Sequence, residues 1–313
     1  MNGRKVFHPS DPRLFQRLNP WQGEAADAVV VGVPSDEGVV LGGGRAGAAE
    51  GPSALRRALR RFGVTYDLEY DTDFDSLRLG DAGDVEVAPG EIARTHDRVT
   101  ERVGSILDAG AVAIVIGGGN DATFASVRAL QLRSSTTGGV NVDAHFDVRP
   151  VVDGKLTSGT PYFRIVEELG IAGTRLSELG AHSSVNARAH ARWLAEQGIA
   201  CVPLSKVREL GARQALADEL ERIERASDAL FVSIDLDVFA GAFAPGVSAP
   251  GTEGLTPEEG RAIAHAAGRH AQVRLFEIME LCPPHDVDQR TARLAAFLLC
   301  AFLSGLARRK IER

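Results

Sequence analysis

The chain has 313 residues, of which 44% are hydrophobic and 25% are charged. This balance is that of an ordinary globular protein and excludes the disordered, collagen-like and disulfide-rich classes. The formal net charge of −7 argues against a nucleic-acid-binding surface, which usually carries an excess of basic residues, so we expect a small-molecule partner and no nucleic acid.

The N-terminal residues and the cysteines both favour the cytoplasm. Residues 1–19 are polar and lack the apolar core of a signal peptide. Cys201, Cys282 and Cys300 are odd in number and widely spaced, which argues against a disulfide framework or a thiolate zinc site. The richest apolar stretch, 294–306, is shorter than the roughly 18 residues that cross a bilayer, so we expect a buried helix there and no membrane partner.

Short apolar runs alternate along the chain with segments rich in Ala, Leu, Arg and Glu. The runs predict strands at 28–33, 113–116, 139–142, 230–234 and 273–278. The other segments predict helices at 53–61, 93–109, 185–197, 214–226, 257–267 and 289–306. This alternation is typical of βαβ units, and strands that are apolar on both faces indicate a mostly parallel sheet with helices on both sides. We therefore predict an α/β fold with three αβα layers in a single domain, 1–313, on which residues 1–27 pack as an N-terminal extension.

Most of the predicted strands run into loops rich in Gly, Asp, Asn or His. In an open parallel sheet, ligands bind outside the carboxyl ends of the strands. We therefore expect the polar residues of these loops to converge on one edge of the sheet.

The strongest local signal is a set of acids at the ends of two predicted strands. Asp143, His145 and Asp147 alternate, and the side-chain period of two in an extended chain points all three to one side. Asp235 and Asp237 alternate in the same way after another strand. Any one of these acids is as easily a solvated loop residue or a helix cap. Gathered at the ends of apolar strands, however, the carboxylates need a cation to neutralise them.

The composition of this set favours two manganese ions. Four carboxylates and one imidazole are more than one ion needs, and they suit two ions that share bridging carboxylates. A ligand set dominated by oxygen favours Mn²⁺ over Zn²⁺, which prefers tetrahedral sites rich in nitrogen and sulfur. We expect two Mn²⁺ ions that activate water at this site.

Several motifs resemble those of the ureohydrolases, a superfamily that includes arginases, agmatinases and formimidoylglutamases. They are Asp-Ala-His-Phe-Asp at 143–147, Ser-Ile-Asp-Leu-Asp at 233–237, the glycines at 117–119 and Met279-Glu280. Further motifs at 33–38, 44–48, 146–149, 158–161 and 244–250 resemble the formimidoylglutamases most. The resemblance spans roughly Val29 to Leu299. It implies an arginase-like fold and hydrolysis of N-formimidoyl-L-glutamate to L-glutamate and formamide, a step of histidine degradation. We also expect a homo-oligomer.

The resemblance assigns roles to the metal-binding residues. It implies that Asp143 and Asp235 bridge the two ions, that Asp147 completes one ion, and that His145 and Asp237 complete the other. Asp147 is also the candidate to carry a proton to the leaving amine.

The chain departs from most relatives at two positions. Directly after the glycine run most relatives have a ligating His, whereas this chain has Asn120, whose amide oxygen is a neutral and weaker donor. We expect Asn120 to be a ligand of a weaker first site. Arginase-like and agmatinase-like members carry a His before a Gly-x-Pro, where this chain has Ser158. This favours a formimidoylglutamase and leaves another amidinohydrolase as an alternative. A non-catalytic arginase-like protein is a second alternative, supported by Asn120 alone.

The expected substrate is a cationic amidine that bears carboxylates. Glu280, at the end of the last predicted strand, is the candidate partner of the cation, although a lone acid there can also be a cap. Arginine is the usual partner of a carboxylate. The candidates are Arg149, which lies two residues beyond Asp147, and then Arg45, Arg164 and Arg175. A structural salt bridge is an equally good interpretation of Arg149. The polar loop after residue 180 adds His182 and Asn186 as candidate substrate contacts.

Overall fold

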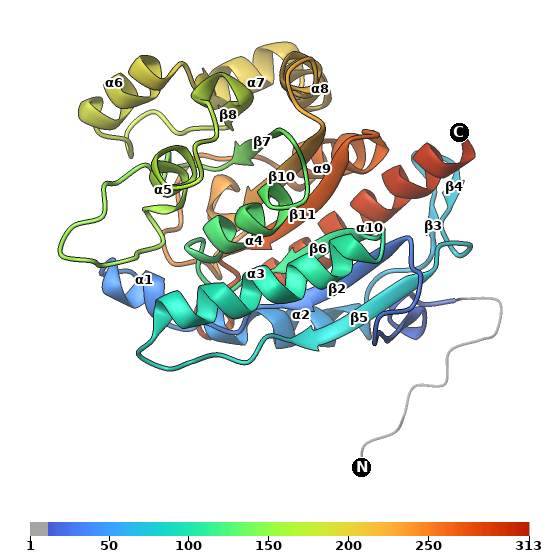
Figure 1. Cartoon of the computed structure of the whole chain (residues 1–313). Coiled ribbons are helices and arrows are strands. Elements are labelled where there is room, and N and C mark those ends of the chain that lie inside the picture. The colour runs from blue at the N-terminus through green and yellow to red at the C-terminus, as the bar shows by residue number, and fades with distance from the viewer. Residues whose placement is uncertain (1–11, 313) are drawn as a thin grey trace.

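Nine strands form the central sheet of the computed structural model, which describes residues 12–312 (Figure 1). In sheet order they are β1 (Leu18–Pro20), β5 (Leu79–Asp84), β2 (Ala28–Gly32), β6 (Val112–Ile116), β11 (Val273–Met279), β10 (Ala229–Asp235), β7 (Thr137–Val142), β8 (Leu176–Leu179) and β9 (Ala200–Val202). Every neighbouring pair in this sheet is parallel. A separate antiparallel hairpin joins β3 (Tyr66–Asp67) and β4 (Thr72–Asp73).

The five strands predicted from the sequence are the five adjacent strands at the centre of the sheet, β2, β6, β11, β10 and β7. Successive residues of these strands enter different hydrophobic cores. Val30 and Ile114 face one core, while Val29 and Ala113 face the other. Both faces of the central strands are therefore buried, as the apolar runs predicted.

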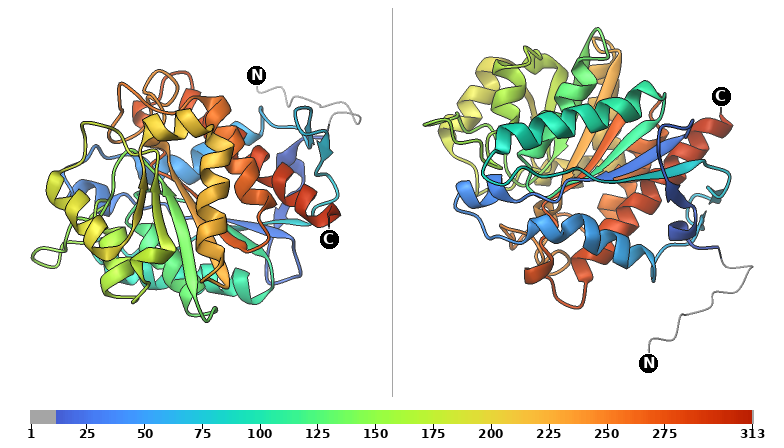
Figure 2. Two further views of the ribbon diagram at one scale, coloured as in Figure 1. Left: turned by 90° about the horizontal axis from the view of Figure 1, so that it is seen from above. Right: turned by 60° about the horizontal axis from the view of Figure 1, so that its bottom comes forward.

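Helices cover both faces of the sheet (Figure 2). One layer contains α2 (Gly51–Leu59), α7 (Leu204–Leu210), α8 (Ala212–Glu224), α9 (Pro257–Arg269) and α10 (Arg290–Ile311). The other contains α3 (Ile92–Asp108), α4 (Ala122–Gln131), α5 (Pro161–Glu167) and α6 (Arg188–Gln197). The short helix α1 (Glu37–Leu41) follows β2. The predicted three-layer α/β fold is confirmed.

The longest helix, α10, belongs to the core. The predicted apolar stretch, 294–306, was too short to cross a bilayer, whereas the full helix is long and apolar enough to do so. However, 78% of the most apolar 18 residues of α10 are buried inside the fold. Phe302 of this helix stacks on Phe276 of β11 with ring centroids 4.1 Å apart. Packing against the sheet explains the apolar composition of this helix.

The segment 12–27, expected to pack as an extension, contributes to the sheet itself. β1 pairs with β5 at the sheet edge, and Trp21, which follows β1, is 4% exposed. Residues 1–11 of the expected extension lie outside the described residues.

Candidate metal centre

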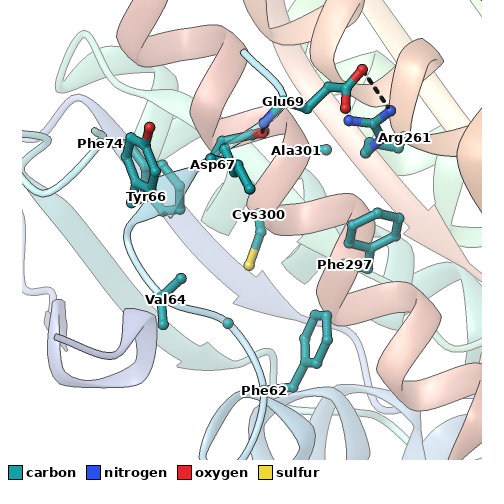
Figure 3. Close-up of a pocket in the computed structure, with 12 residues that line it drawn as sticks. Phe62, Val64, Tyr66, Asp67, Glu69, Phe74, Arg261, Phe297, Cys300 and Ala301 are labelled. Carbon is teal, nitrogen blue, oxygen red and sulfur yellow. Dashed lines mark hydrogen bonds and ion pairs between the residues drawn. The ribbon is translucent and has the colours of Figure 1, made fainter. Parts of the chain in front are cut away.

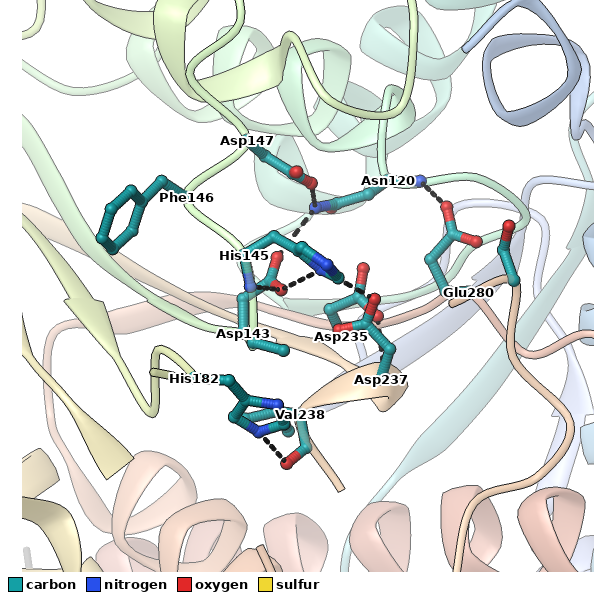
Figure 4. Close-up of polar contacts among 12 residues, drawn as sticks. Asn120, Asp143, His145, Phe146, Asp147, His182, Asp235, Asp237, Val238 and Glu280 are labelled. Atoms are coloured by element: carbon teal, nitrogen blue, oxygen red, sulfur yellow. Dashed lines mark hydrogen bonds and ion pairs between the residues drawn. The ribbon is translucent and has the colours of Figure 1, made fainter. Parts of the chain in front are cut away.

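The carboxyl ends of four neighbouring strands bring the predicted ligands together (Figure 4). β6 leads to Asn120, β7 to the segment 143–147, β10 to Asp235, and β11 to Glu280. Because these strands lie in the order β6-β11-β10-β7 and run parallel, their carboxyl ends meet at one edge of the sheet. The backbone N–H of Asn120 donates to Oε1 of Glu280 at 2.8 Å, although the two residues are 160 positions apart.

Close packing explains the glycines before Asn120. A Cβ atom on Gly118 would overlap the backbone carbonyl of Ser35, and a Cβ atom on Gly117 would overlap the side chain of Met279. Since glycine alone lacks Cβ, these residues let the loop after β6 pass close to its neighbours. The loop can then deliver Asn120 to the acids.

Asp147 and Glu280 both have left-handed backbone conformations, with φ of 49° and 65°. This region costs a non-glycine residue about 1–3 kcal/mol and is enriched at functional sites. A glycine would relieve the strain and remove the carboxyl group. The surrounding structure therefore holds two carboxylates in place at the expense of local backbone stability.

The acids form two overlapping groups of possible metal ligands. One group is Asp143, His145 and Asp237, and the other is Asp143, Asp147 and Asp235. Within each group, one ligand atom per residue lies within 4.8 Å of the others. Asp143 belongs to both groups, as expected of a bridging carboxylate; a second bridge through Asp235 stays a prediction.

Burial makes this arrangement costly without a cation. It raises the pKa of Asp147 and Asp235 well above the usual range, and neighbouring carboxylates add to the effect. Burial and then Asp143 raise the pKa of Asp237 to about 6. Burial lowers the pKa of His145, but hydrogen bonds to Asp143 and Asp237 outweigh it and raise this pKa to about 12. The acids thus oppose one another's ionisation, and a divalent cation would relieve the repulsion.

Two buried oxygen atoms support the same conclusion. Oδ1 of Asp237 and Oε2 of Glu280 have no hydrogen-bond partner among the described residues. Buried carboxylate oxygens are normally hydrogen-bonded or bound to metal. A donor set of carboxylates with one imidazole fits two divalent ions of the Mn²⁺ class.

Asn120 reaches the acids, but its amide nitrogen faces them. Nδ2 donates to Oδ2 of Asp147 at 2.7 Å, and Oδ1 accepts from Oγ1 of Thr123 at 2.8 Å. A half-turn of the amide would exchange the two groups, because the Thr123 hydroxyl can also accept from Nδ2. The oxygen would then face the acids. Metal ligation by Asn120 stays a prediction.

A cavity of about 180 Å³ opens above the acids. Besides four of the predicted ligands, it is lined by Arg149, Ser158, Glu280 and the backbone of Gly42–Gly44, among others. Arg149 is exposed, and no hydrogen bond or ion pair of its side chain is found among the described residues. Arg149 and Glu280 thus give the cavity one cationic and one anionic group besides the metal ligands.

A larger cavity of about 370 Å³ lies between the segment 62–74 and α10 (Figure 3). Phe62, Phe74 and Phe297 form much of its wall, and Arg261 pairs with Glu69 at 3.5 Å. It has no cluster of acids among its lining residues. We therefore assign the chemistry to the smaller, polar cavity.

Three predicted substrate contacts stabilise loops instead of lining the cavity. The guanidinium of Arg45 donates to the carbonyl oxygens of Val247 and Ser248. Nε2 of His182 lies 3.2 Å from the carbonyl oxygen of Val238. Backbone groups thus engage both side chains and neither lines the cavity, so their contact with a substrate stays a prediction without support from this geometry.

Asn186 also bonds to backbone groups. Its Oδ1 accepts from the backbone N–H of Phe146 at 3.0 Å, and its Nδ2 donates to the carbonyl oxygen of Ala144 at 2.8 Å. Asn186 thus fixes the loop that carries His145 and does not reach the cavity.

The two other candidate arginines also lie elsewhere. Arg164 is buried in α5, where it stacks on Phe124 and pairs with Glu168. Arg175 directly precedes β8 and so lies at the amino end of a strand, opposite the edge that carries the acids.

The structure adds buried polar residues behind the acids that the sequence did not single out. Asn141 and Glu178 hydrogen-bond to each other at 2.8 Å, and Thr123 supports Asn120. Asn141 sits in an apolar run and Glu178 in a strand that was not predicted. The spacing of two residues between Asn141 and Asp143 was the one available signal, and it did not extend to Glu178.

Comparison with known proteins identifies close similarities over the whole chain. The model of the arginase family matches residues 26–304. A formimidoylglutamase from Aromatoleum aromaticum is 35% identical, with 99% of this chain and 93% of that protein covered. The crystal structure of formiminoglutamase from Trypanosoma cruzi with Mn²⁺ superposes with a TM-score of 0.90 at 36% identity, covering 96% and 99% of the two chains. Formimidoylglutamase from Bacillus subtilis gives a TM-score of 0.91 at 26% identity, covering 98% and 95%.

The role of Asn120 can be tested by metal titration. If its amide oxygen ligates the first ion, Asn120→His should tighten that site because imidazole is the stronger donor. Activity should stay within about tenfold, or roughly 1.4 kcal/mol of barrier. Asn120→Ala should weaken the first ion selectively. Calorimetric titration with Mn²⁺ distinguishes the three proteins. Identical titrations would show that Asn120 is not a ligand.

Stabilisation by Mn²⁺ should increase with pH. The folded-state pKa of Asp237, about 6, exceeds its ordinary value of 3.8, so the folded metal-free protein binds this proton more tightly than the unfolded chain does. Its stability therefore falls as pH rises through this window. Ionised ligands bind metal, so Mn²⁺ affinity rises over the same window. The difference in Tm between Mn²⁺-loaded and chelator-treated protein should widen as pH rises from about 4 to about 6. A constant or narrowing difference would contradict the metal assignment.

Proposed function

The chain belongs to the arginase family, and we propose that it hydrolyses N-formimidoyl-L-glutamate to L-glutamate and formamide. The observation that carries this proposal is the convergence of two ligand groups, sharing Asp143, on a cavity that also contains Glu280 and Arg149. The similarity to formimidoylglutamases over nearly the full chain supports the choice of substrate.

The proposed cofactor is a pair of Mn²⁺ ions. Five residues would hold them: Asp143, His145, Asp147, Asp235 and Asp237, with Asn120 as a further candidate. Bound ions of this class supply hydroxide near neutral pH by lowering the pKa of coordinated water. The oxygen-rich ligand set and the presence of Mn²⁺ in the Trypanosoma cruzi formiminoglutamase structure support manganese.

Two acids of the cavity have distinct proposed tasks. Oε1 of Glu280 is held by the backbone of Asn120, which leaves Oε2 without a partner among the described residues. This oxygen would pair with the cationic formimidoyl group and hold the amidine carbon over the metal ligands. Asp147 lines the cavity beside His145, Asp235 and Asp237. We propose that it carries a proton from the attacking water to the leaving nitrogen.

These tasks define the reaction. Water attacks the amidine carbon, forms a carbon–oxygen bond and gives one proton to Asp147. The resulting tetrahedral intermediate collapses when Asp147 delivers this proton to the nitrogen of the glutamate moiety, and the bond between that nitrogen and the amidine carbon breaks. The hydroxyl proton of the intermediate passes to the departing amine, so that L-glutamate and formamide remain. Arg149 would bind a carboxylate of the substrate, since the planar guanidinium pairs with carboxylates.

This proposal has two alternatives. One is that the chain is an amidinohydrolase with another substrate, and the other is that it is an arginase-like protein without catalytic activity. Ser158 lines the cavity at the position where arginase-like and agmatinase-like members carry His, which favours the formimidoyl substrate. The retention of all five acidic and histidine ligands favours an enzyme. Asn120 supports the non-catalytic alternative.

We also propose a cytoplasmic homo-oligomer that acts in histidine degradation and binds neither membranes nor nucleic acid. The three free cysteines suit a reducing compartment, and the burial of α10 argues against a membrane role. The net charge of −7 argues against nucleic acid.

The function is tested by a substrate screen. Metal-free protein is reconstituted with Mn²⁺ or Zn²⁺ and assayed with formimidoylglutamate, arginine, agmatine and guanidinobutyrate. We expect formamide release to exceed urea release at least about tenfold, Mn²⁺ to restore activity better than Zn²⁺, and a chelator to abolish it. Preferred urea release would establish the alternative amidinohydrolase. Metal binding without any turnover would favour the non-catalytic alternative.

Replacing Glu280 tests its contact with the substrate cation. Glu280→Gln keeps the shape of the side chain and removes the charge. Loss of one partner of a buried charge pair costs about 2–5 kcal/mol, so kcat/KM should fall roughly 30-fold or more while calorimetric Mn²⁺ binding is unchanged. Glu258→Gln, an exposed change on α9, serves as the control. If Glu280→Gln loses metal, Glu280 is a ligand rather than a substrate contact.

A further inference from the structure

A row of buried polar residues crosses four neighbouring strands directly behind the acids. Glu178 of β8 is in register with Asn141 of β7, Asn141 with Ser233 of β10, and Ser233 with Glu277 of β11. All four are at most 1% exposed. Strands buried on both faces of a parallel sheet are normally apolar, and burying polar groups is costly. A row of this kind therefore calls for a physical explanation.

The explanation at one end of the row lies in the spacing of Asn141 and Asp143. Nδ2 of Asn141 donates to Oδ2 of Asp143 at 3.2 Å and to Oε2 of Glu178 at 2.8 Å. An amide nitrogen has two hydrogens, so it can make both bonds at once. The other oxygen of Asp143, Oδ1, accepts from the backbone N–H of His145 at 2.7 Å. Both oxygens of Asp143 are therefore held by hydrogen bonds.

Glu178 determines the orientation of the amide. Oδ1 of Asn141 has no hydrogen-bond partner among the described residues, so the oxygen side of the amide is not anchored. Without an acceptor at Glu178, one amide hydrogen would be left buried and unpaired. Burial, and then the charge of Asp143, raise the pKa of Glu178 well above the usual range.

We propose that Glu178 is a positioning residue of the metal centre, which orients Asp143 through Asn141. This inference rests on the proposed function, because it requires that the acids bind metal. Asp143 is the carboxylate common to both ligand groups, so a change in its orientation affects both ions. Partners outside the ligand set orient the ligands themselves, and their removal typically costs about 10–100-fold in metal affinity.

Three variants separate this role from ordinary core packing. Glu178→Gln keeps an oxygen that accepts from Asn141 Nδ2. Glu178→Leu replaces the side chain with an apolar one of similar size and removes the acceptor. Ser177→Ala is the matched control, because Ser177 is the preceding residue of β8, is 1% exposed, and has no hydrogen bond from its hydroxyl among the described residues.

The measurement is calorimetric titration of the metal-free proteins with Mn²⁺, after circular dichroism has shown that each is folded. We expect Glu178→Leu to bind Mn²⁺ about 10–100-fold more weakly, and Glu178→Gln and Ser177→Ala to stay within about threefold of wild type. If Glu178→Leu does not fold, Asn141→Ala replaces it, with the same expected loss.

Two outcomes would overturn the positioning role. One is wild-type affinity in folded Glu178→Leu. The other is equal loss in the Gln and Leu variants, since the Gln variant retains the acceptor. Failure of the wild-type protein to bind Mn²⁺ would instead contradict the proposed function, so the two failures are distinguishable.

Discussion

Mutual repulsion among buried carboxylates is the constraint on which the rest of this structure depends. Asp143, Asp235 and Asp237 are each at most 5% exposed, and a ligand atom of Asp143 lies within 4.8 Å of one from each of the other two. To offset them and Asp147, the fold supplies one imidazole, the amides of Asn120 and Asn141, and several backbone N–H groups. These groups carry too little positive charge to neutralise the four carboxylates, so the site requires a cationic cofactor. The left-handed backbone at Asp147 and Glu280 shows that the fold also accepts local strain to keep carboxyl groups at this edge.

The central part of this arrangement was predictable because two independent patterns coincide there. Apolar runs identify strands, and the period of two within Asp143, His145 and Asp147 places three ligands on one side of the chain. Parallel strand order then brings Asp235 to the same edge. The five predicted strands proved to be adjacent in the sheet, which is why the predicted ligands meet.

The parts that were not predicted lack such patterns, each for a physical reason. β8 is buried, but two of its four residues, Ser177 and Glu178, are polar, so its sequence does not show the apolar run that predicts a buried strand. α4 is buried at eight of its ten positions, so it shows no alternation of apolar and polar faces. Arg45 and Asn186 look like substrate contacts because they are polar and lie near motifs. The fold was needed to show that their side chains form hydrogen bonds with backbone groups of neighbouring loops.

The strand order has a consequence for how the protein matures during synthesis. β11 is the last strand in the sequence, yet it lies between β6 and β10 at the centre of the sheet. The two halves of the sheet therefore cannot join until residue 279 has left the ribosome, when nearly the whole chain has been made. Until then Asn120 and Asp235 belong to separate halves. During this interval the unpaired edges of β6 and β10 are apolar and open to contact with other chains, and Asn120 and Glu280 cannot yet join the acids carried by β7 and β10.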